Sequence, residues 1–527
     1  MARAAEDLMR ASTKAARQRA AAAQRDSRSP VVAFFGSPFG AALVSAILLL
    51  AAFPPFDLSL LVFVALVPWL GALADATPRQ AARSGYAFGL VFMGGQMFWL
   101  QPFVSRWTHS WVLGTVPWLL ATAAGALYFM GAGWLVQRCW SWRRPWLIPI
   151  VWAGVELLRS YILVLAFPWG LVATPLWLLT PMIQLAHYGT IYAVSAWVVL
   201  ANVLGARFLR GDRFLETRNG AMALVALLAL SLVRYNAPAP GEVKTVTLGQ
   251  PGVDLAFGDP ARTDREVAMA VNEIILSAAT QNVDLVVLPE GLVNEGAFPP
   301  HPSFDVIPGT VFGGKRGGDP AYQAAFAFDG KWHYADKTRL VVFGEYVPGR
   351  QFLPFLDAFH VPGGDLQPGE RVTAIDVGGL RVGPMLCFEG LFYDVGLKQA
   401  ANGAQLLAQM SIDDWYMGTA APDQLRMAAP FRAVEAGVPM VRAASLGYSL
   451  AVDARGDLIA VAPLGKQVAT TLRVTVPKRP DLFPLLAVFP WIAGLSVPAV
   501  ALASWWGGRR RPGGAIPVAP RGSGRSE

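Results

Sequence analysis

The sequence predicts an α/β membrane protein, in which an eight-helix transmembrane bundle carries one inserted soluble domain. The first observation is composition: 54% of the 527 residues are hydrophobic and only 15% are charged, whereas soluble globular chains average about 25% charged residues. The second observation is distribution. Charges are scarce over residues 31–235, return at globular frequency over 236–482 and become scarce again over 483–506. The length also exceeds that of one ordinary domain.

Eight hydrophobic segments have the length that a helix needs to cross the hydrocarbon core of a membrane. Their approximate ranges are 31–53, 56–74, 84–104, 111–136, 146–165, 181–206, 219–235 and 483–506. We therefore expect about seven helices within residues 31–235 and one closing helix at 483–506. Only the sequence PPFD separates the first two segments, so a re-entrant pair is the alternative there.

The distribution of arginines predicts the orientation of these segments. Arginines precede the first segment, occupy alternate loops and follow the last segment: Arg3, Arg10, Arg17, Arg19, Arg25, Arg28, Arg79, Arg83, Arg138, Arg143, Arg144, Arg207, Arg210, Arg213, Arg218, Arg509, Arg510, Arg511, Arg521 and Arg525. Because basic residues stay on the cytoplasmic side, both termini are expected in the cytoplasm and residues 236–482 outside it. The same arginines account for most of the net charge of +8, so we expect no nucleic-acid partner.

Two basic segments flank the predicted bundle. Residues 1–30 are polar and rich in Ala and Arg, and they lack the short apolar core of a cleavable signal peptide. We expect a disordered cytoplasmic segment here, with an amphipathic helix on the membrane surface as the alternative. Residues 507–527 form a second basic cytoplasmic tail.

Residues 236–482 have the size and pattern of one α/β domain. Short β-branched or apolar runs predict strands at 245–250, 283–290, 324–330, 372–379, 380–387, 404–411, 439–445, 448–456 and 468–476. The turn sequences FDGK, VGGL and ARGD predict hairpins between some of them. Helical patterns cover residues 263–281 and 423–437. This mixture predicts mixed sheets with helices on the outside.

Polar residues stand at the ends of several predicted strands. Glu290 ends one apolar run, Lys337 and Glu345 flank another, and Cys387 ends a third. Reactive groups gather at the carboxyl ends of strands in α/β sheets, so these residues are expected in one cleft. A carboxylate can activate a thiol, and a fixed ammonium can stabilise the oxyanion that forms when the thiolate attacks an acyl carbonyl. Taken singly, each residue has an ordinary structural interpretation, such as a small buried thiol.

The two cysteines are expected on opposite sides of the membrane. Cys139 falls at the cytoplasmic end of the fourth hydrophobic segment, whereas Cys387 lies in the external domain. They therefore cannot form a disulfide with each other, and Cys387 is expected to be an unpaired thiol.

These stretches, in this order, resemble the carbon–nitrogen hydrolase (nitrilase) superfamily. The full arrangement, a multi-span bundle before the domain and one span after it, is similar to that of the apolipoprotein N-acyltransferase family. The resemblance is carried by VELLRSYILVLAFPWG in the fifth segment and by LPEG, DKTRLVVFGEYVPG, CFEG and SIDDW in the domain. It implies an αββα sandwich facing the periplasm of a bacterial inner membrane, with the active site opening towards the lipid.

The resemblance also implies a reaction. Cys387 would take a fatty acyl chain from a phospholipid as a thioester and pass it to the N-terminal amine of a diacylglyceryl-cysteine lipoprotein. Glu290 would be the general base and Lys337 the oxyanion partner. Glu345 and Glu389 would support the site, or form structural ion pairs. Three further residues would lie at the substrate: Tyr346, Phe388 and Trp415. No cofactor is implied, and a monomer is expected.

This sequence departs from the family pattern at several positions near the implied site. Phe388 stands where a Tyr is frequent, Ile412 replaces an Asn, Leu425 replaces a His, Leu288 replaces a Trp, and residues 445–447 read SLG instead of NNG. These differences leave open the acylation of a different amine by a divergent paralogue. Two further alternatives are a membrane-tethered amidase or hydrolase, which would gain nothing from eight spans, and a non-catalytic transporter or scaffold, against which the intact Glu, Lys and Cys set speaks.

Other features give weaker signals. The five histidines show no metal-ligand spacing, so no metal is expected. The sequence GGKRGGD (313–319) lacks phosphate-loop spacing and is interpreted as a surface turn. Residues 349–365 are apolar and punctuated by Gly and Pro, and they form either a mobile arm that enters lipid or a packed loop. Glu156 and Arg159 lie three residues apart on one helical face and are expected to form a structural pair.

Overall fold

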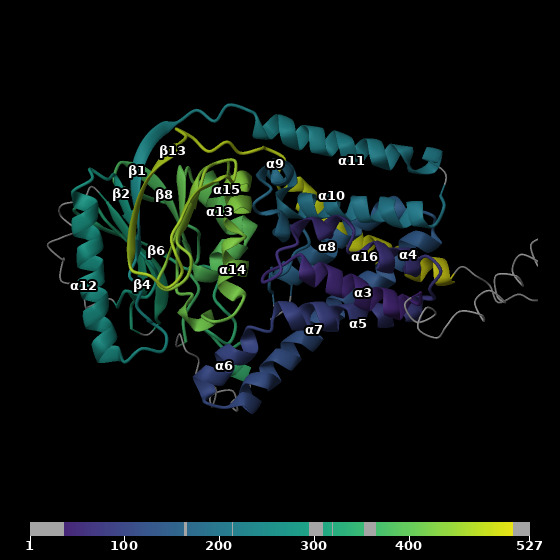
Figure 1. Ribbon diagram of the computed structural model, residues 1–527, viewed down its shortest axis with the longest axis horizontal. Coiled ribbons are helices and arrows are strands. Elements are labelled where there is room, and N and C mark those ends of the chain that lie inside the picture. The colour runs from purple at the N-terminus through teal and green to yellow at the C-terminus, as the bar shows by residue number, and fades with distance from the viewer. Residues whose placement is uncertain are drawn as a thin grey trace, which may run out of the picture.

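The computed structural model describes residues 36–162, 166–212, 214–294, 309–318, 320–352 and 365–509. The chain forms a helical bundle and a two-sheet α/β unit that lie against each other, as Figure 1 shows. The basic segment 1–30, the tail beyond Arg509 and most of the loop 349–365 lie outside the described residues.

The helical part is built from apolar helices that begin at recognisable caps. Ser37 and Ser110 accept from backbone amides of the first turns that follow them, and Thr77 forms a capping box with Gln80. The elements are α3 (Pro38–Ala51), η1 (Ser59–Phe63), α4 (Val67–Leu73), α5 (Pro78–Gln96), α6 (Leu100–Thr108), α7 (Trp111–Ser141), η2 (Pro145–Leu147), α8 (Ile148–Tyr161), η3 (Thr174–Leu176), α9 (Thr180–Ile183), α10 (Ala186–Leu209), α11 (Phe214–Tyr235) and α16 (Val488–Arg509).

The predicted count of eight spanning helices is not confirmed. Within the described ranges, four helices are long and apolar enough to cross a membrane: α7, α10, α11 and α16. A fifth is added if α5 and α6, which meet at 55°, count as one broken span. The first, second and fifth predicted segments form shorter pieces, because α3 and α8 have 14 residues each and η1–α4 is broken.

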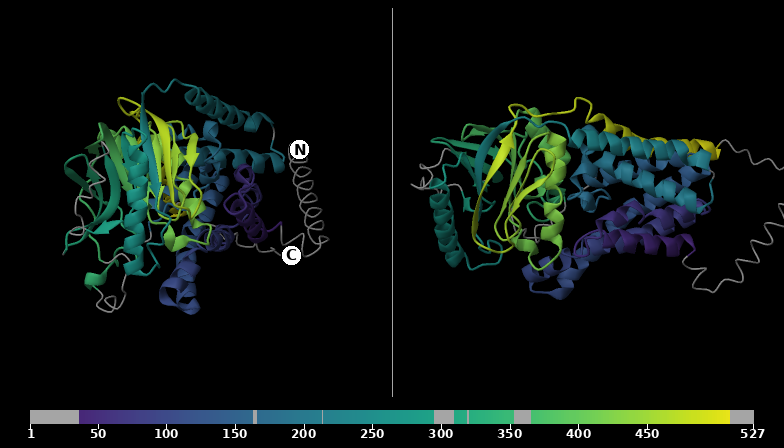
Figure 2. Two further views of the ribbon diagram at one scale, coloured as in Figure 1. Left: turned by 60° about the vertical axis from the view of Figure 1, so that its left-hand side comes forward. Right: turned by 45° about the horizontal axis from the view of Figure 1, so that its top comes forward.

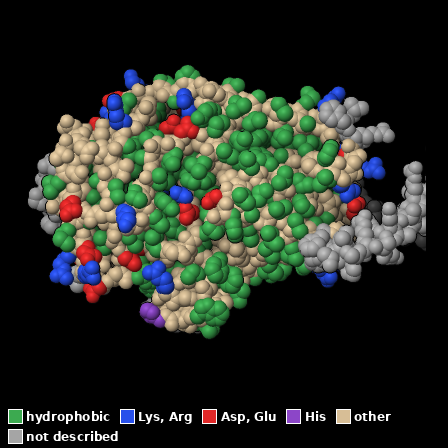
Figure 3. Space-filling view, in the orientation of Figure 1, with side chains coloured by type: hydrophobic (Ala, Val, Ile, Leu, Met, Phe, Trp, Pro, Cys, Tyr) green, Lys and Arg blue, Asp and Glu red, His purple; other side chains and the backbone are tan. Residues whose placement is uncertain are grey.

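Much of the bundle surface is apolar. On the face shown in Figure 3, hydrophobic side chains cover the helical part, while most charged side chains lie over the α/β unit or at the far end of the bundle. α16 contributes Trp491, Ile492, Leu495, Leu502, Trp505 and Trp506 to the exposed hydrophobic residues. A surface of this extent is typical of a protein in contact with lipid.

The α/β unit contains two sheets. One has the strand order β13-β1-β2-β4-β5-β6, with β3 paired to β4, and the other has the order β12-β11-β10-β9-β8-β7. The strands are β1 (Glu242–Gln250), β2 (Leu285–Val287), β3 (Val293–Asn294), β4 (Thr310–Arg316), β5 (Tyr322–Phe328), β6 (Trp332–Asp336), β7 (Ile375–Val377), β8 (Leu380–Leu386), β9 (Leu406–Ser411), β10 (Met440–Ala444), β11 (Leu450–Val452), β12 (Leu458–Val461) and β13 (Val468–Val476).

The two sheets pack face to face, and helices cover both outer faces (Figures 1 and 2). Alternating apolar residues such as Leu248, Val382 and Leu386 fill the layer between the sheets. α12 (Pro260–Ala279) covers the outer sheet, and α13 (Tyr393–Ala401) and α15 (Ala429–Ala436) cover the sheet nearer the bundle. The predicted mixed sheets with helices outside are therefore confirmed.

Three local predictions were wrong. Residues 313–316 of the supposed surface turn GGKRGGD belong to β4, because they pair with β5 on an interior strand of the sheet. The apolar run after Lys337 is not a strand; it forms a tight turn in which Glu345 N bonds to Val341 O. The helix predicted at 423–437 is two helices, α14 (Ala421–Arg426) and α15, which ends on left-handed Gly437.

Glu156 and Arg159 form no ion pair with each other in the described structure. Glu156 Oε1 instead accepts from Trp152 Nε1 (3.1 Å) and Val172 N (2.8 Å). Arg159 Nη1 donates to the carbonyl of Trp169 at 2.5 Å. Both side chains are buried, so their role is to hold the loop that follows α8.

Candidate functional site

Cys387 follows the last residue of β8 and begins the 3-10 helix η7 (Cys387–Leu391). Its φ of 44° places a non-glycine residue in the left-handed region, which is uncommon and often marks a functional position. As a whole residue Cys387 is less buried than Leu386 and Phe388 on either side of it. The turn therefore presents the thiol while the flanking residues anchor the chain.

Glu290 and Lys337 come from the opposite sheet and lie together. Glu290 stands three residues after β2, and Lys337 follows β6 directly. Lys337 Nζ lies 3.4 Å from Glu290 Oε1 and 2.6 Å from Glu345 Oε1. Lys337 is 1% exposed and Glu290 3%, so the ammonium is enclosed by two carboxylates.

The strand β4 explains how Glu290 is held. Gly313 N donates to Pro289 O (3.0 Å), and Gly291 N donates to Gly313 O (2.9 Å). A Cβ at Gly313 would lie 2.8 Å from Glu290 Cα, so only glycine allows this approach. The motif that looked like a surface turn thus supports the carboxylate.

The electrostatics of these groups set which of them carry a proton in the resting site. Burial raises the pKa of Glu290 to about 7, because it outweighs the attraction of Lys337. Burial, followed by the charge of Glu290, raises the pKa of the Cys387 thiol to about 12. Burial alone would lower the pKa of Lys337, but Glu290 and Glu345 outweigh it and hold the pKa above its ordinary value. Near pH 7 the resting site therefore holds a neutral thiol, and Glu290 is divided between its acid form and the carboxylate that can accept a proton.

Glu345 and Glu389 both accept hydrogen bonds from backbone amides. Of these two carboxylates, only Glu345 also pairs with Lys337. Glu345 Oε2 accepts from Val341 N at 2.9 Å. Glu389 Oε1 accepts from Thr338 N (2.7 Å) and Thr338 Oγ1 (2.8 Å), and its Oε2 accepts from Leu386 N (2.9 Å). Glu389 therefore ties the residue after Lys337 to the residue before Cys387. Burial raises its pKa, against these hydrogen bonds.

The predicted substrate-facing aromatics occupy different places. Phe388 stacks on Phe167 of the bundle at 5.4 Å between ring centroids. Trp415 lies against Phe103 and Trp107 of α6 at 5.9 and 5.7 Å. The backbone carbonyl of Tyr346 accepts a hydrogen bond from Phe343 N at 2.8 Å.

Sequence reasoning missed two residues beside the thiol. Ser411 ends β9 next to β8, and Tyr416 is near enough that the charge of Cys387 adds to burial in raising the pKa of its phenol. Tyr416 also packs against Trp99 and Phe103 at 5.0 and 5.8 Å. The helical part therefore adds an aromatic wall to the surroundings of the thiol. SIDDWY carried the only sequence signal for both residues.

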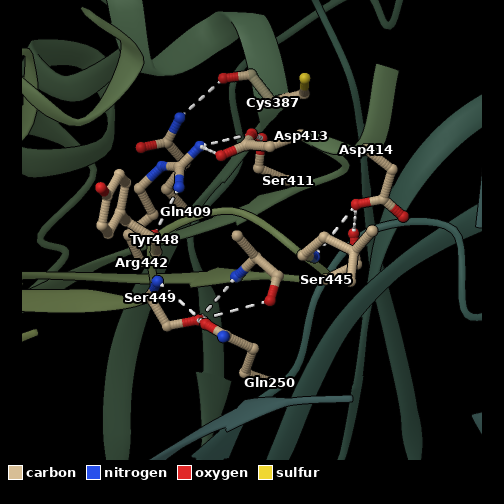
Figure 4. A network of polar contacts seen from close by, with 12 residues as sticks. Gln250, Cys387, Gln409, Ser411, Asp413, Asp414, Arg442, Ser445, Tyr448 and Ser449 are labelled. Carbon is tan, nitrogen blue, oxygen red and sulfur yellow. Dashed lines mark hydrogen bonds and ion pairs between the residues drawn. The ribbon is translucent and has the colours of Figure 1, made fainter. Parts of the chain in front are cut away.

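Three of the five departures from the family pattern lie in different places. A Cβ on Gly291 would meet Ile412 Cδ1 at 2.5 Å, so Ile412 packs beside the turn that carries Glu290. Ser445 donates to Asp414, which also accepts from Leu446 N (3.0 Å) and Leu255 N (2.7 Å), as Figure 4 shows in part. Leu425 is an apolar core residue and makes no polar network.

No group of three or more His, Cys, Asp or Glu side chains that could hold a metal occurs among the described residues. The geometry offers the chemistry of a thiol, a carboxylate with a pKa near neutrality and a fixed ammonium. Such a set can form and resolve a thioester.

Comparison with known proteins matches both parts of the fold. A family model described as apolipoprotein N-acyltransferase N-terminal domain matches residues 45–204, and one described as carbon-nitrogen hydrolase matches residues 306–476. Among solved structures, Nit3 of Saccharomyces cerevisiae, a member of branch 10 of the nitrilase superfamily, is 19% identical, with a TM-score of 0.34 over 45% of this chain and 92% of that chain.

Relatives extend over nearly the whole chain. An apolipoprotein N-acyltransferase from Geobacter metallireducens is 30% identical over an alignment of 497 residues that covers 87% of this chain and 94% of that protein. Another from Methylococcus capsulatus is 30% identical over an alignment of 459 residues that covers 82% of this chain and 88% of that protein. Since the similarity covers both the helical part and the α/β unit, the chain belongs to the apolipoprotein N-acyltransferase family.

Proposed function

We propose that this bacterial membrane protein transfers a fatty acyl chain from a phospholipid, through a thioester on Cys387, to the N-terminal amine of a diacylglyceryl-cysteine lipoprotein. The family supports lipoprotein N-acylation. The observation that carries the residue roles is the buried Glu290–Lys337 pair, whose charges both act on the Cys387 thiol.

The reaction divides into two half-reactions. In the first, Glu290 takes the thiol proton, the thiolate attacks the ester carbonyl, and Lys337 stabilises the oxyanion. The leaving lysophospholipid alkoxide takes the proton from Glu290, which leaves a thioester on Cys387. In the second, the lipoprotein amine attacks the thioester, Glu290 accepts an amine proton, and Cys387 leaves as a thiolate that takes this proton from Glu290.

The location of the site supports lipid substrates. Extracting an acyl chain from a bilayer costs about 0.8 kcal/mol per CH₂, and a site beside the bundle avoids that cost. Phe388 and Tyr416 join the site to aromatic residues of the helical part. We place residues 236–482 on the periplasmic side of the inner membrane, between the bundle 31–235 and the helix 483–506, with segments 1–30 and 507–527 cytoplasmic. The protein would act as a monomer.

The test is to incubate the purified protein in detergent with phospholipid that carries a labelled acyl chain. We expect a hydroxylamine-sensitive label on Cys387 that is absent from Cys387→Ala and present in Cys139→Ala, since Cys139 is buried in the bundle. Added diacylated lipopeptide should then receive the label on its amino terminus.

Two outcomes would contradict the proposal. If the wild type takes up no label, Cys387 does not form a thioester from phospholipid. If the label appears only as free fatty acid when lipopeptide is present, the protein is a hydrolase.

A further inference from the structure

Ser411 lies beside Cys387 because of the register between two strands. β8 and β9 are parallel, and their last paired residues are Leu386 and Met410. The next residues in line are Ser411, which ends β9, and Cys387, which follows β8, so the two lie side by side at the ends of neighbouring strands. Gln409 Nε2 donates to the carbonyl of Cys387 at 2.7 Å and ties the two strand ends together (Figure 4).

The hydroxyl of Ser411 is held by a buried ion pair. Ser411 is 1% exposed, and its Oγ donates to Asp413 Oδ1 at 2.8 Å. Arg442 Nη2 lies 2.7 and 2.8 Å from the two oxygens of Asp413, and Arg442 Nη1 donates to Tyr448 O at 2.6 Å. A Cβ on Gly447 would lie 1.9 Å from Asp413 Oδ2. Gly447 therefore leaves room for the ion pair, and it is the one residue of SLG (445–447) that agrees with the family pattern NNG.

The pairing of Asp413 with Arg442 allows the hydroxyl of Ser411 to donate its proton to another acceptor. A serine hydroxyl has one proton and two acceptor sites, and in this structure the proton is directed to Asp413. Both oxygens of Asp413 already accept from Arg442, so Asp413 keeps charge-assisted hydrogen bonds if the hydroxyl turns away. A partner for that proton appears when Cys387 becomes a thiolate.

We propose that Ser411 is a catalytic residue whose hydroxyl turns from Asp413 to the sulfur of Cys387 when the thiolate forms, while Arg442 keeps Asp413 satisfied. This rests on Cys387 being the nucleophile of the proposed function. The rotation of the hydroxyl makes and breaks no covalent bond, because the thiol proton goes to Glu290 and Ser411 keeps its own proton. The same hydrogen bond would stabilise Cys387 as the leaving thiolate in the second half-reaction.

The charged and titratable groups around Cys387 are consistent with this role. Glu290 and Asp413 raise the pKa of the thiol, while Lys337 and the hydrogen bond that Ser411 can give to the thiolate lower it, within the larger effect of burial. The phenol of Tyr416 also lies near. Ser411 is thus an uncharged donor in a site that otherwise depends on Lys337 to favour the thiolate.

The experiment measures the rate at which iodoacetamide alkylates Cys387 across pH, in Cys139→Ala protein in detergent. Ser411→Ala should slow alkylation about tenfold at neutral pH and throughout the pH range below the raised pKa of the thiol, and Ser411→Thr should restore the rate. Ser449→Ala is the matched control, because Ser449 is equally buried and bonds Gln250 and Ala444, away from Cys387.

An unchanged rate of alkylation across this pH range in Ser411→Ala would overturn the proposal. Equal slowing in Ser411→Ala and Ser449→Ala would also overturn it, since it would show a general loss of structure. Alkylation needs neither phospholipid nor lipoprotein. An effect specific to Ser411 would therefore stand even if the acyl-transfer experiment failed. Acyl transfer could likewise succeed while Ser411→Ala left alkylation unchanged.

Discussion

At the scale of single residues, the central feature is a carboxylate and an ammonium buried 3.4 Å apart beside a thiol. Buried charges persist only when they are paired, and Lys337 has two carboxylates within reach. The second carboxylate, Glu345, leaves Glu290 less constrained than it would be in an isolated pair. Glu290 can therefore become protonated while Lys337 keeps a partner.

The pKa of Glu290 predicts how the first half-reaction depends on pH. Glu290 accepts a proton only as a carboxylate, and its pKa is raised to about 7 by burial. Formation of the acyl-enzyme should therefore be slow at pH 5, rise through a midpoint near pH 7 and level off above it. The measurement is the initial rate of acyl label incorporation between pH 5 and 9.

Glu290→Gln should remove that midpoint and lower the rate by about 10²–10⁴-fold. The control is Glu370→Gln, which makes the same change at an exposed carboxylate and should behave as the wild type. A midpoint that persisted near pH 7 in Glu290→Gln would assign the titration to another group.

At the scale of elements, the sequence predicted the strands better than the helices. Alternation and turn residues located most strands of the two sheets, and with them the chain positions of Glu290 and Cys387. Hydropathy instead overestimated the helices, because it registers apolar composition and not where a helix ends. The fifth segment stops being helical after Tyr161, where Glu156 and Arg159 bind the loop backbone.

Ser411 and the role of Gly313 could not be read from the sequence. Ser411 lies beside Cys387 through the pairing of β8 with β9, and Gly313 approaches Glu290 through the pairing of segments in the other sheet. Such long-range register depends on how whole strands pack and not on local pattern. The ends of strands were therefore predictable, but not the neighbours that those ends acquire.

The packing of α5 on α7 allows a test at this scale. Gly133 of α7 lies so close to α5 that a Cβ there would be 2.4 Å from Ala81 O, while a Cβ on Gly131, two residues earlier, would meet nothing within 4 Å. Gly133→Ala should destabilise the protein by about 1–3 kcal/mol through overpacking. Gly131→Ala should be neutral or stabilising by up to about 1 kcal/mol, since alanine favours a helix.

Thermal unfolding of the two variants in detergent measures the difference. We expect a lower midpoint for Gly133→Ala than for Gly131→Ala. Equal midpoints would mean that the helices separate easily enough to accept a methyl group at their contact.

At the scale of the whole molecule, one buried ion pair joins the bundle to the turn that carries the thiol. α10 is interrupted at Gly189 and Thr190, which leaves unpaired backbone amides in the turn that follows. Glu435 of α15 accepts from one of them, Ile191 N, at 2.8 Å. Arg432 donates to Glu435 (3.0 Å) and to the carbonyl of Leu391 (2.7 Å), the last residue of η7.

This connection predicts a large stability loss for a substitution outside the site itself. Glu435 and Arg432 are each 1% exposed, so Glu435→Ala would leave a buried cation without its partner and Ile191 N without an acceptor. Breaking a buried pair in this way costs about 3–5 kcal/mol. Asp481→Ala is the control, because Asp481 pairs with Arg234 of α11 but is 65% exposed in its side chain, and exposed pairs contribute about 0–1 kcal/mol.

The expected result is a clearly lower unfolding midpoint in detergent for Glu435→Ala and a midpoint near that of the wild type for Asp481→Ala. Glu435→Gln should fall between them, because its amide oxygen can still accept from Ile191 N although the charge is lost. Since Arg432 also holds the end of η7, alkylation of Cys387 should change in Glu435→Ala and not in Asp481→Ala. Similar midpoints for Glu435→Ala and Asp481→Ala would show that the bundle and the α/β unit are held together by their apolar contacts, with no measurable contribution from this ion pair.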